Sequence, residues 1–104
     1  MLTPYGDNQG GGLWEGNLAL LSIQQAVRDY QGWRTIYDTL GEVQRDWGVT
    51  AESVHQLIGE PNTVLVLHSF ATVAQAQGFL TCRAIRAAME RAGVEGVPRV
   101  EIYR

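Results

Sequence analysis

The chain alternates four short apolar runs with two segments of helical periodicity, and this order limits its fold more than any other feature. The apolar runs cover residues 18–23, 53–58, 63–70 and 99–103. Their length and apolar content are typical of strands. The segment Gly-Glu-Pro-Asn at 59–62 separates the second run from the third, and its residues favour a hairpin turn. The predicted order is therefore strand, helix, strand, strand, helix, strand.

The first predicted helix follows Asp29, whose carboxylate is a favourable N-cap, and ends at Gly48. Apolar side chains recur within it at spacings of three and four residues, whereas most charged side chains lie off this stripe. The stripe consists of Tyr30, Trp33, Ile36, Tyr37, Leu40, Val43 and Trp47. We expect one helix of about four turns that packs its apolar face on a sheet.

The second predicted helix begins at Thr72, which forms a possible capping box with Gln75, and ends at Gly93. Its apolar side chains also share one side, and Pro98 then precedes the last strand. The order βαββαβ is that of ferredoxin-like domains. The sequence thus predicts an α+β protomer, with an antiparallel sheet and two helices on one sheet face.

Two of the predicted strands, 18–23 and 63–70, carry apolar side chains on both of their alternating faces. Helices on one side of a sheet cover only one face, and an exposed apolar face is unfavourable in water. Pairing with the same face of a second copy buries it most simply. We therefore expect a homodimer in which two sheets form a small α/β barrel.

The length of 104 residues is that of one domain, which we place at residues 18–104. Residues 1–17 are rich in glycine and are expected to form a flexible arm. The net charge is −3 and no basic stripe is present, so nucleic acid and membranes are not expected partners. Cys82 is the single cysteine, which excludes an internal disulfide. Without a secretory signal or a long apolar run, we expect a cytoplasmic protein.

Two histidines are candidate catalytic bases. His68 lies among apolar residues of the third strand and is expected to be buried, while His55 lies on the second strand. If Ile58 pairs with Thr63, the two imidazoles share one sheet face, but a shift of one residue places them on opposite faces. The sequence leaves this register open, and a purely structural role is the alternative for each histidine. Two histidines do not complete a metal site, so we expect no metal.

Aromatic side chains of the first helix are candidate substrate-binding residues. Trp33 and Tyr37 lie one turn apart, with Tyr30 one turn before them. Such a row suits the wall of a cavity for a flat aromatic ligand, although core packing produces the same pattern. Arg34 is a further candidate, for an anionic group on the ligand, and a solvated or ion-paired arginine is the alternative.

Several segments of the chain together resemble the small dimeric α/β-barrel proteins of the antibiotic biosynthesis monooxygenase-like superfamily, over about residues 18–103. The similar segments are Asp-Tyr-Gln-Gly-Trp-Arg at 29–34 with Tyr-Asp at 37–38, Glu-Pro-Asn at 60–62, Ala76 with Phe79, Ile-Arg-x-Ala-Met at 85–89, and Ala-Gly-Val-x-Gly-x-Pro at 92–98. The resemblance implies a ferredoxin-like protomer, a homodimer and a ligand cavity between sheet and helices, with Trp33 and Tyr37 on its wall.

Proteins of this superfamily include cofactor-independent oxygenases of polyketide quinones, polyketide cyclases and haem-degrading enzymes. The resemblance therefore implies a cofactor-independent monooxygenase or cyclase acting on an aromatic, polyketide-like molecule, with His68 as the base. A non-catalytic binding or structural homodimer is the alternative, and a haem-degrading oxygenase is a further one. Two positions depart from the family pattern. Ser69 stands where an acidic residue is frequent, and Thr81-Cys82 replaces a Ser-Pro step, which predicts a straighter second helix.

Overall fold

The computed structural model describes residues 18–104, so the predicted flexible arm at 1–17 lies outside the described residues. Strands and helices follow the predicted order. The elements are β2 (Ala19–Val27), α2 (Tyr30–Tyr37), η1 (Asp38–Leu40), α3 (Gly41–Asp46), β3 (Val49–Leu57), β4 (Glu60–Phe70), α4 (Val73–Phe79), α5 (Arg83–Arg91) and β5 (Val94–Tyr103). No helix among these residues is long and apolar enough to cross a membrane.

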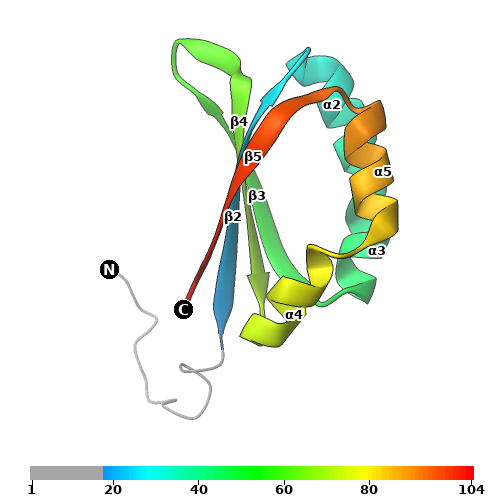
Figure 1. The fold of residues 1–104 in the computed structure, drawn as a ribbon, viewed down its shortest axis with the longest axis vertical. Coiled ribbons are helices and arrows are strands. Elements are labelled where there is room, and N and C mark those ends of the chain that lie inside the picture. The colour runs from blue at the N-terminus through cyan, green and yellow to red at the C-terminus, as the bar shows by residue number, and fades with distance from the viewer. Residues whose placement is uncertain (1–17) are drawn as a thin grey trace.

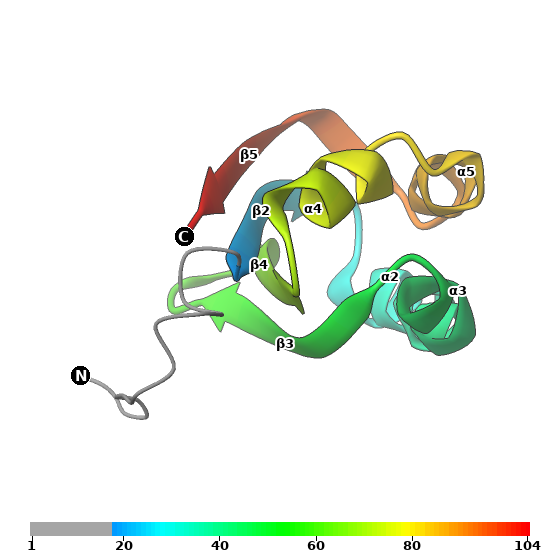
Figure 2. The same cartoon turned by 90° about the horizontal axis from the view of Figure 1, so that it is seen from below.

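The four strands form one sheet in the order β3-β4-β2-β5, and all neighbouring pairs are antiparallel. Figures 1 and 2 show every helix on the same side of this sheet, which curves around the helical layer. The two-layer arrangement is the ferredoxin-like α+β fold that the sequence predicts. It leaves one sheet face covered by helices and the other face uncovered within the described chain.

The register between β3 and β4 differs from the pairing of Ile58 with Thr63. Leu57 pairs with Glu60 across the two-residue turn Ile58–Gly59, and Gly59 supplies the positive φ of 90° that this tight turn requires. The predicted four-residue loop is therefore wrong, because residues 60–62 belong to β4. An irregularity next to the turn then sets the register of the remaining ladder.

This register places the two histidines on opposite faces of the sheet. His55 pairs with Leu65, whereas His68 pairs with Glu52. Successive side chains of a strand alternate between faces, so His68 and Glu52 lie on the helix-covered face and His55 lies on the outer face. The pairing of Ile58 with Thr63, which would have placed both imidazoles on one sheet face, does not occur.

The N-terminus of α2 is held by two side chains. The predicted cap Asp29 accepts a hydrogen bond from the Gly32 amide at 2.8 Å. Asn62 of the β4 bulge accepts one from the Tyr30 amide, also at 2.8 Å. These bonds satisfy two amides that a helix start leaves without intrahelical partners. They also fix α2, which carries Trp33 and Tyr37, to the hairpin.

Both long helices predicted from the sequence are interrupted. The first is divided by the 3-10 turn η1, and the second is divided at residues 80–82. The expectation of a straighter second helix is therefore wrong. The Thr81 hydroxyl donates to the Gly78 carbonyl at 2.7 Å, and such a side-chain bond competes with helix continuation. Cys82 leaves the helical conformation, with ψ at 114°, and buries its side chain at the break rather than in a helix interior.

The uncovered face of the sheet carries apolar side chains from all four strands. Leu20, Leu57 and Tyr103 are 36–49% exposed, and Leu65 and Leu67 between them are half-buried. On the opposite face, alternate residues of β4 from Val64 to Phe70 are buried under the helices. Only one face of the strands is thus buried in a single chain.

Candidate functional site

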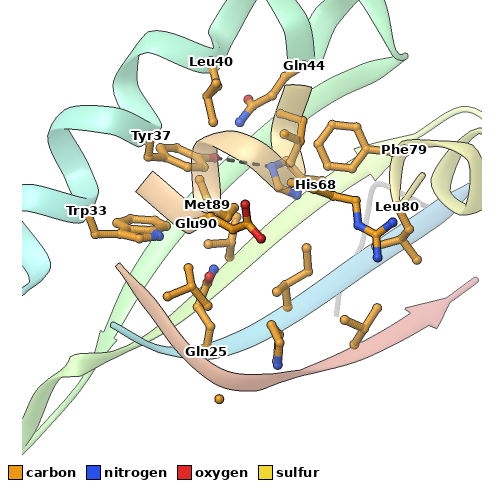
Figure 3. A pocket seen from close by; sticks show the side chains of 18 residues that line it. Gln25, Trp33, Tyr37, Leu40, Gln44, His68, Phe79, Leu80, Met89 and Glu90 are labelled. Atoms are coloured by element: carbon orange, nitrogen blue, oxygen red, sulfur yellow. Dashed lines mark hydrogen bonds between the residues drawn. The ribbon is translucent and has the colours of Figure 1, made fainter. Parts of the chain in front are cut away.

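A cavity of about 700 Å³ lies between the sheet and the helices, and we call it the inner cavity. Two buried apolar clusters flank it: one contains Val66 and Trp33, and the other contains Phe70 and Phe79. His68 stands between Val66 and Phe70 on β4, where the two clusters separate. The lining also includes exposed residues of α5 and β5, so the cavity reaches solvent between these elements. Figure 3 shows the side chains that line it.

His68 is the titratable group at the centre of the inner cavity. Its side chain is 3% exposed, and its Nδ1 atom has no hydrogen-bond partner among the described residues. Its Nε2 atom lies 3.4 Å from the Tyr37 hydroxyl, the contact drawn as a dashed line in Figure 3. Burial lowers the pKa of His68 from 6.5 to about 4, and the charge of Glu52 only partly opposes this effect. The imidazole is therefore neutral at pH 7.

The Tyr37 hydroxyl connects His68 to a carboxylate. It donates a hydrogen bond to Glu52 Oε1 at 2.5 Å. Burial raises the pKa of Tyr37 well above 10.0, and the bond to Glu52 raises it further, so the phenol keeps its proton. Because that proton points to Glu52, the phenol oxygen can only accept from His68. The contact thus assigns the proton to Nε2 and leaves Nδ1 with a free lone pair.

Trp33 extends the wall of the cavity on the other side of Tyr37. The two rings are stacked, with centroids 4.9 Å apart and planes inclined by 18°. Trp33 is fully buried, yet its indole N–H has no partner in the part of the chain that the structure describes. An unsatisfied buried donor costs about 1–3 kcal/mol, and a ligand acceptor would satisfy it. Trp33 and Tyr37 both line the inner cavity, as the resemblance implied.

The remaining residues predicted from the sequence lie outside the inner cavity. Tyr30 continues the aromatic row, 6.0 Å from Trp33, but is absent from the lining. Arg34 forms an ion pair with Asp38 at 2.9 Å and stacks over the Tyr37 ring. His55 is exposed on the outer face, where its Nε2 atom lies 2.9 Å from the Ser53 hydroxyl. The structure brings together His68, Tyr37 and Trp33, and it separates His55 from them.

Sequence reasoning missed several polar residues around the site. Glu52 was not a candidate, although the correct hairpin register places it opposite His68. Gln25 and Gln44 are about 5% exposed and line the inner cavity. Glutamine side chains are mostly exposed in folded proteins, so two buried amides mark this region as a candidate site. Arg86 and Glu90 of α5 also belong to the lining. Their exposure makes them indistinguishable from ordinary solvated charges in the sequence alone.

A second, smaller hollow of about 340 Å³ lies on the far side of Tyr37, and we call it the outer cavity. It is formed by residues of α2, η1, α3 and β3, including Glu52 and Arg45. Tyr37 and Gln44 line both cavities and so form the wall between them. Glu52 is exposed and lines only the outer one.

Solved structures share this fold at low sequence identity. A protein from Bordetella bronchiseptica, provisionally assigned as an antibiotic biosynthesis monooxygenase, superposes with a TM-score of 0.72 at 11% identity, over 85% of this chain and 96% of that chain. SnoaB, a cofactor-independent oxygenase from Streptomyces nogalater, gives a TM-score of 0.70 at 8% identity, over 85% and 92%. A conserved protein from Methanosarcina mazei Go1 gives 0.70 at 13% identity, also over 85% and 92%.

These similarities confirm, at the level of the fold, the resemblance to antibiotic biosynthesis monooxygenase-like proteins. No family model and no curated protein matches the chain. Identities of 8–13% show a shared fold and carry no information about activity.

The buried neutral His68 predicts a specific dependence of stability on pH. Its pKa is lower in the folded state than in the unfolded chain, so the unfolded chain binds the proton first as the pH falls. Between pH 7 and pH 4.5 this single group should lower the free energy of unfolding by roughly 2 kcal/mol. The variant His68→Leu should lack this component. Urea unfolding of both proteins at the two pH values measures it, and equal losses in the two proteins would contradict the assignment.

Proposed function

We propose that this chain is a cofactor-independent enzyme that removes a proton from an aromatic, polyketide-like molecule bound in the inner cavity. The observation that carries the proposal is a buried, neutral imidazole that belongs to the lining of an aromatic-walled cavity and whose Nδ1 atom has no hydrogen-bond partner among the described residues. The volume lies within the range of about 300–1,000 Å³ of typical ligand sites. The proposed site consists of His68 as the base and of Trp33 and Tyr37 as the binding wall.

In this mechanism His68 accepts a phenolic or α-carbonyl proton at Nδ1. The anion left on the substrate and the new imidazolium form an ion pair, which stabilises both charges in a cavity with few competing water molecules. In an oxygenase the anion then reacts with dioxygen, and in a cyclase it attacks a carbonyl carbon of the same molecule. Both reactions begin with the same proton transfer, and that step is the one His68 is placed to perform.

Two unpartnered polar atoms favour a ligand with polar substituents. The Trp33 indole N–H requires an acceptor, and His68 Nδ1 requires a donor. A hydroxylated aromatic molecule that also carries a carbonyl group supplies both. Side chains that merely filled the interior would leave these atoms unsatisfied, which a native core rarely tolerates. These atoms therefore favour a cavity that binds a ligand over a cavity with no binding function.

A non-catalytic small-molecule-binding protein is the second candidate function. The same cavity and the same unpartnered atoms serve a binding site, and the low pKa of His68, about 4, makes it a weak base until the charge of a substrate anion raises it. Turnover distinguishes the two functions, whereas binding alone is expected of both.

We further propose a homodimer formed through the outer face of the sheet. The apolar residues Leu20, Leu57 and Tyr103 are exposed there in the single chain. An apolar sheet face is covered most simply by the same face of a second copy. The proposed compartment is the cytoplasm, where the thiol of Cys82 stays reduced.

Replacement of His68 tests the proposed chemistry. His68→Gln keeps a polar side chain but removes the base, so turnover of any converted phenolic polyketide should fall by at least about 100-fold. His55→Gln, on the opposite sheet face, should change turnover by much less. The measurement is substrate loss by chromatography over a panel of hydroxylated polycyclic aromatics. Retained turnover in His68→Gln would eliminate His68 as the base.

The dimer is tested by light scattering coupled to size-exclusion chromatography. The chain should elute at twice its mass of 11.5 kDa at micromolar concentration. Leu67→Glu places a charge at the centre of the outer face and should produce a folded monomer, because an unpaired charge is costly to bury. A wild-type monomer would contradict the proposed interface.

A further inference from the structure

A continuous chain of polar contacts leads from the inner cavity to the outer one. It begins at His68, whose Nε2 atom lies 3.4 Å from the Tyr37 hydroxyl, and continues 2.5 Å from that hydroxyl to Glu52 Oε1. His68 and Tyr37 are buried, whereas Glu52 is exposed. Tyr37 itself forms the wall between the two cavities. The contacts therefore connect a buried base to solvent through a single phenol.

We propose that Tyr37 and Glu52 form a proton relay: when His68 accepts a proton at Nδ1, the relay passes the Nε2 proton out of the inner cavity and into the outer cavity. The relay rests on the proposed function, since it needs a base in the inner cavity. Within it Glu52 acts through Tyr37 and is a positioning residue. The outer cavity then serves as the exchange site with water.

The proposed transfer conserves atoms and charge. The substrate O–H bond breaks and a bond from that hydrogen to His68 Nδ1 forms. From the imidazolium formed in this way, the Nε2 proton then passes to the Tyr37 oxygen while the Tyr37 proton passes to Glu52. The products are a substrate anion, a neutral imidazole protonated at Nδ1, a neutral phenol and a protonated carboxyl group, with no change of oxidation state. Glu52 releases its proton to water, and the same path runs backwards when Nδ1 returns a proton to the product.

Charges on the surrounding elements are compatible with this direction of transfer. On β3, Glu52 favours the imidazolium form of His68. On α2, Arg34 stands over the Tyr37 ring with its guanidinium carbon 5.5 Å from the centroid, but it is paired with Asp38. On α5, Arg86 and Glu90 line the inner cavity with opposite charges. Of the carboxylates in the described residues, Glu52 is the one hydrogen-bonded to Tyr37.

The relay can be tested with 2-naphthol, a small aromatic phenol that becomes a strong acid when it is excited by light. With the protein in excess, emission from the bound probe divides between the naphthol and naphtholate bands according to the proton transfer in the cavity. The wild type should show naphtholate emission that His68→Gln removes. Glu52→Gln keeps the shape of the side chain but removes its charge, and should lower the naphtholate-to-naphthol ratio about tenfold.

Two variants control for the change of charge. Glu42→Gln, at an exposed position of α3 outside both cavities, removes the same charge and should leave the ratio at the wild-type value. Glu52→Asp restores the carboxylate and should recover part of the ratio. A purely structural role of Glu52 would lower probe affinity without changing the ratio in the bound state. The ratio therefore reports proton transfer and not folding.

The outcomes separate the relay from the proposed base. An unchanged ratio in Glu52→Gln, with loss in His68→Gln, would overturn the relay and leave the base standing. Failure of the wild type to bind 2-naphthol, or naphtholate emission independent of His68, would contradict the proposed function.

A ¹⁵N NMR pH titration of the ligand-free protein tests whether the charge of Glu52 acts on His68. The pKa of His68 should fall in Glu52→Gln but not in Glu42→Gln, and equal values in all three proteins would overturn the relay.

Discussion

The pairing of β3 with β4 determines which side chains meet inside this protein. Glu52 stands opposite His68, and both face the helices because strand side chains alternate between faces. A shift of one residue would place Glu52 on the outer face and leave His68 without a carboxylate near it. The two-residue turn at Ile58–Gly59 and the irregularity beside it together set this pairing, and Asn62 binds the start of α2 to the same hairpin. The position of Tyr37 between His68 and Glu52 depends on both features.

The site contains buried polar groups that lower the stability of the folded protein. A buried imidazole with a free nitrogen and a buried indole N–H without a partner each cost stability. The neighbouring apolar clusters around Val66 and Phe70 offset this cost with dense aliphatic and aromatic packing. Unsatisfied polar atoms beside an open cavity are characteristic of sites that complete their hydrogen bonds with a ligand.

The sequence was sufficient for the order of the elements and for the burial of His68 and Trp33, because apolar periodicity and turn residues carry that information directly. It did not settle the hairpin register, since the segment at 60–62 is compatible with both a loop and a bulged strand. Glu52 was therefore missed. The interruptions of both helices were missed as well, because the apolar stripes continue through η1 and through Thr81–Cys82. Their causes are local bonds such as that from Thr81 to the Gly78 carbonyl.

We infer that an aromatic phenol binds between the sheet and the helices with its hydroxyl group at His68. A crystal structure of the protein soaked with 1-naphthol tests it most directly, because it locates the ring and the hydroxyl group together. We expect the ring to lie beside Trp33 and Tyr37, with the hydroxyl oxygen within about 3 Å of His68 Nδ1. An inner cavity closed by side chains, or a ligand seated only on the outer sheet face, would contradict it.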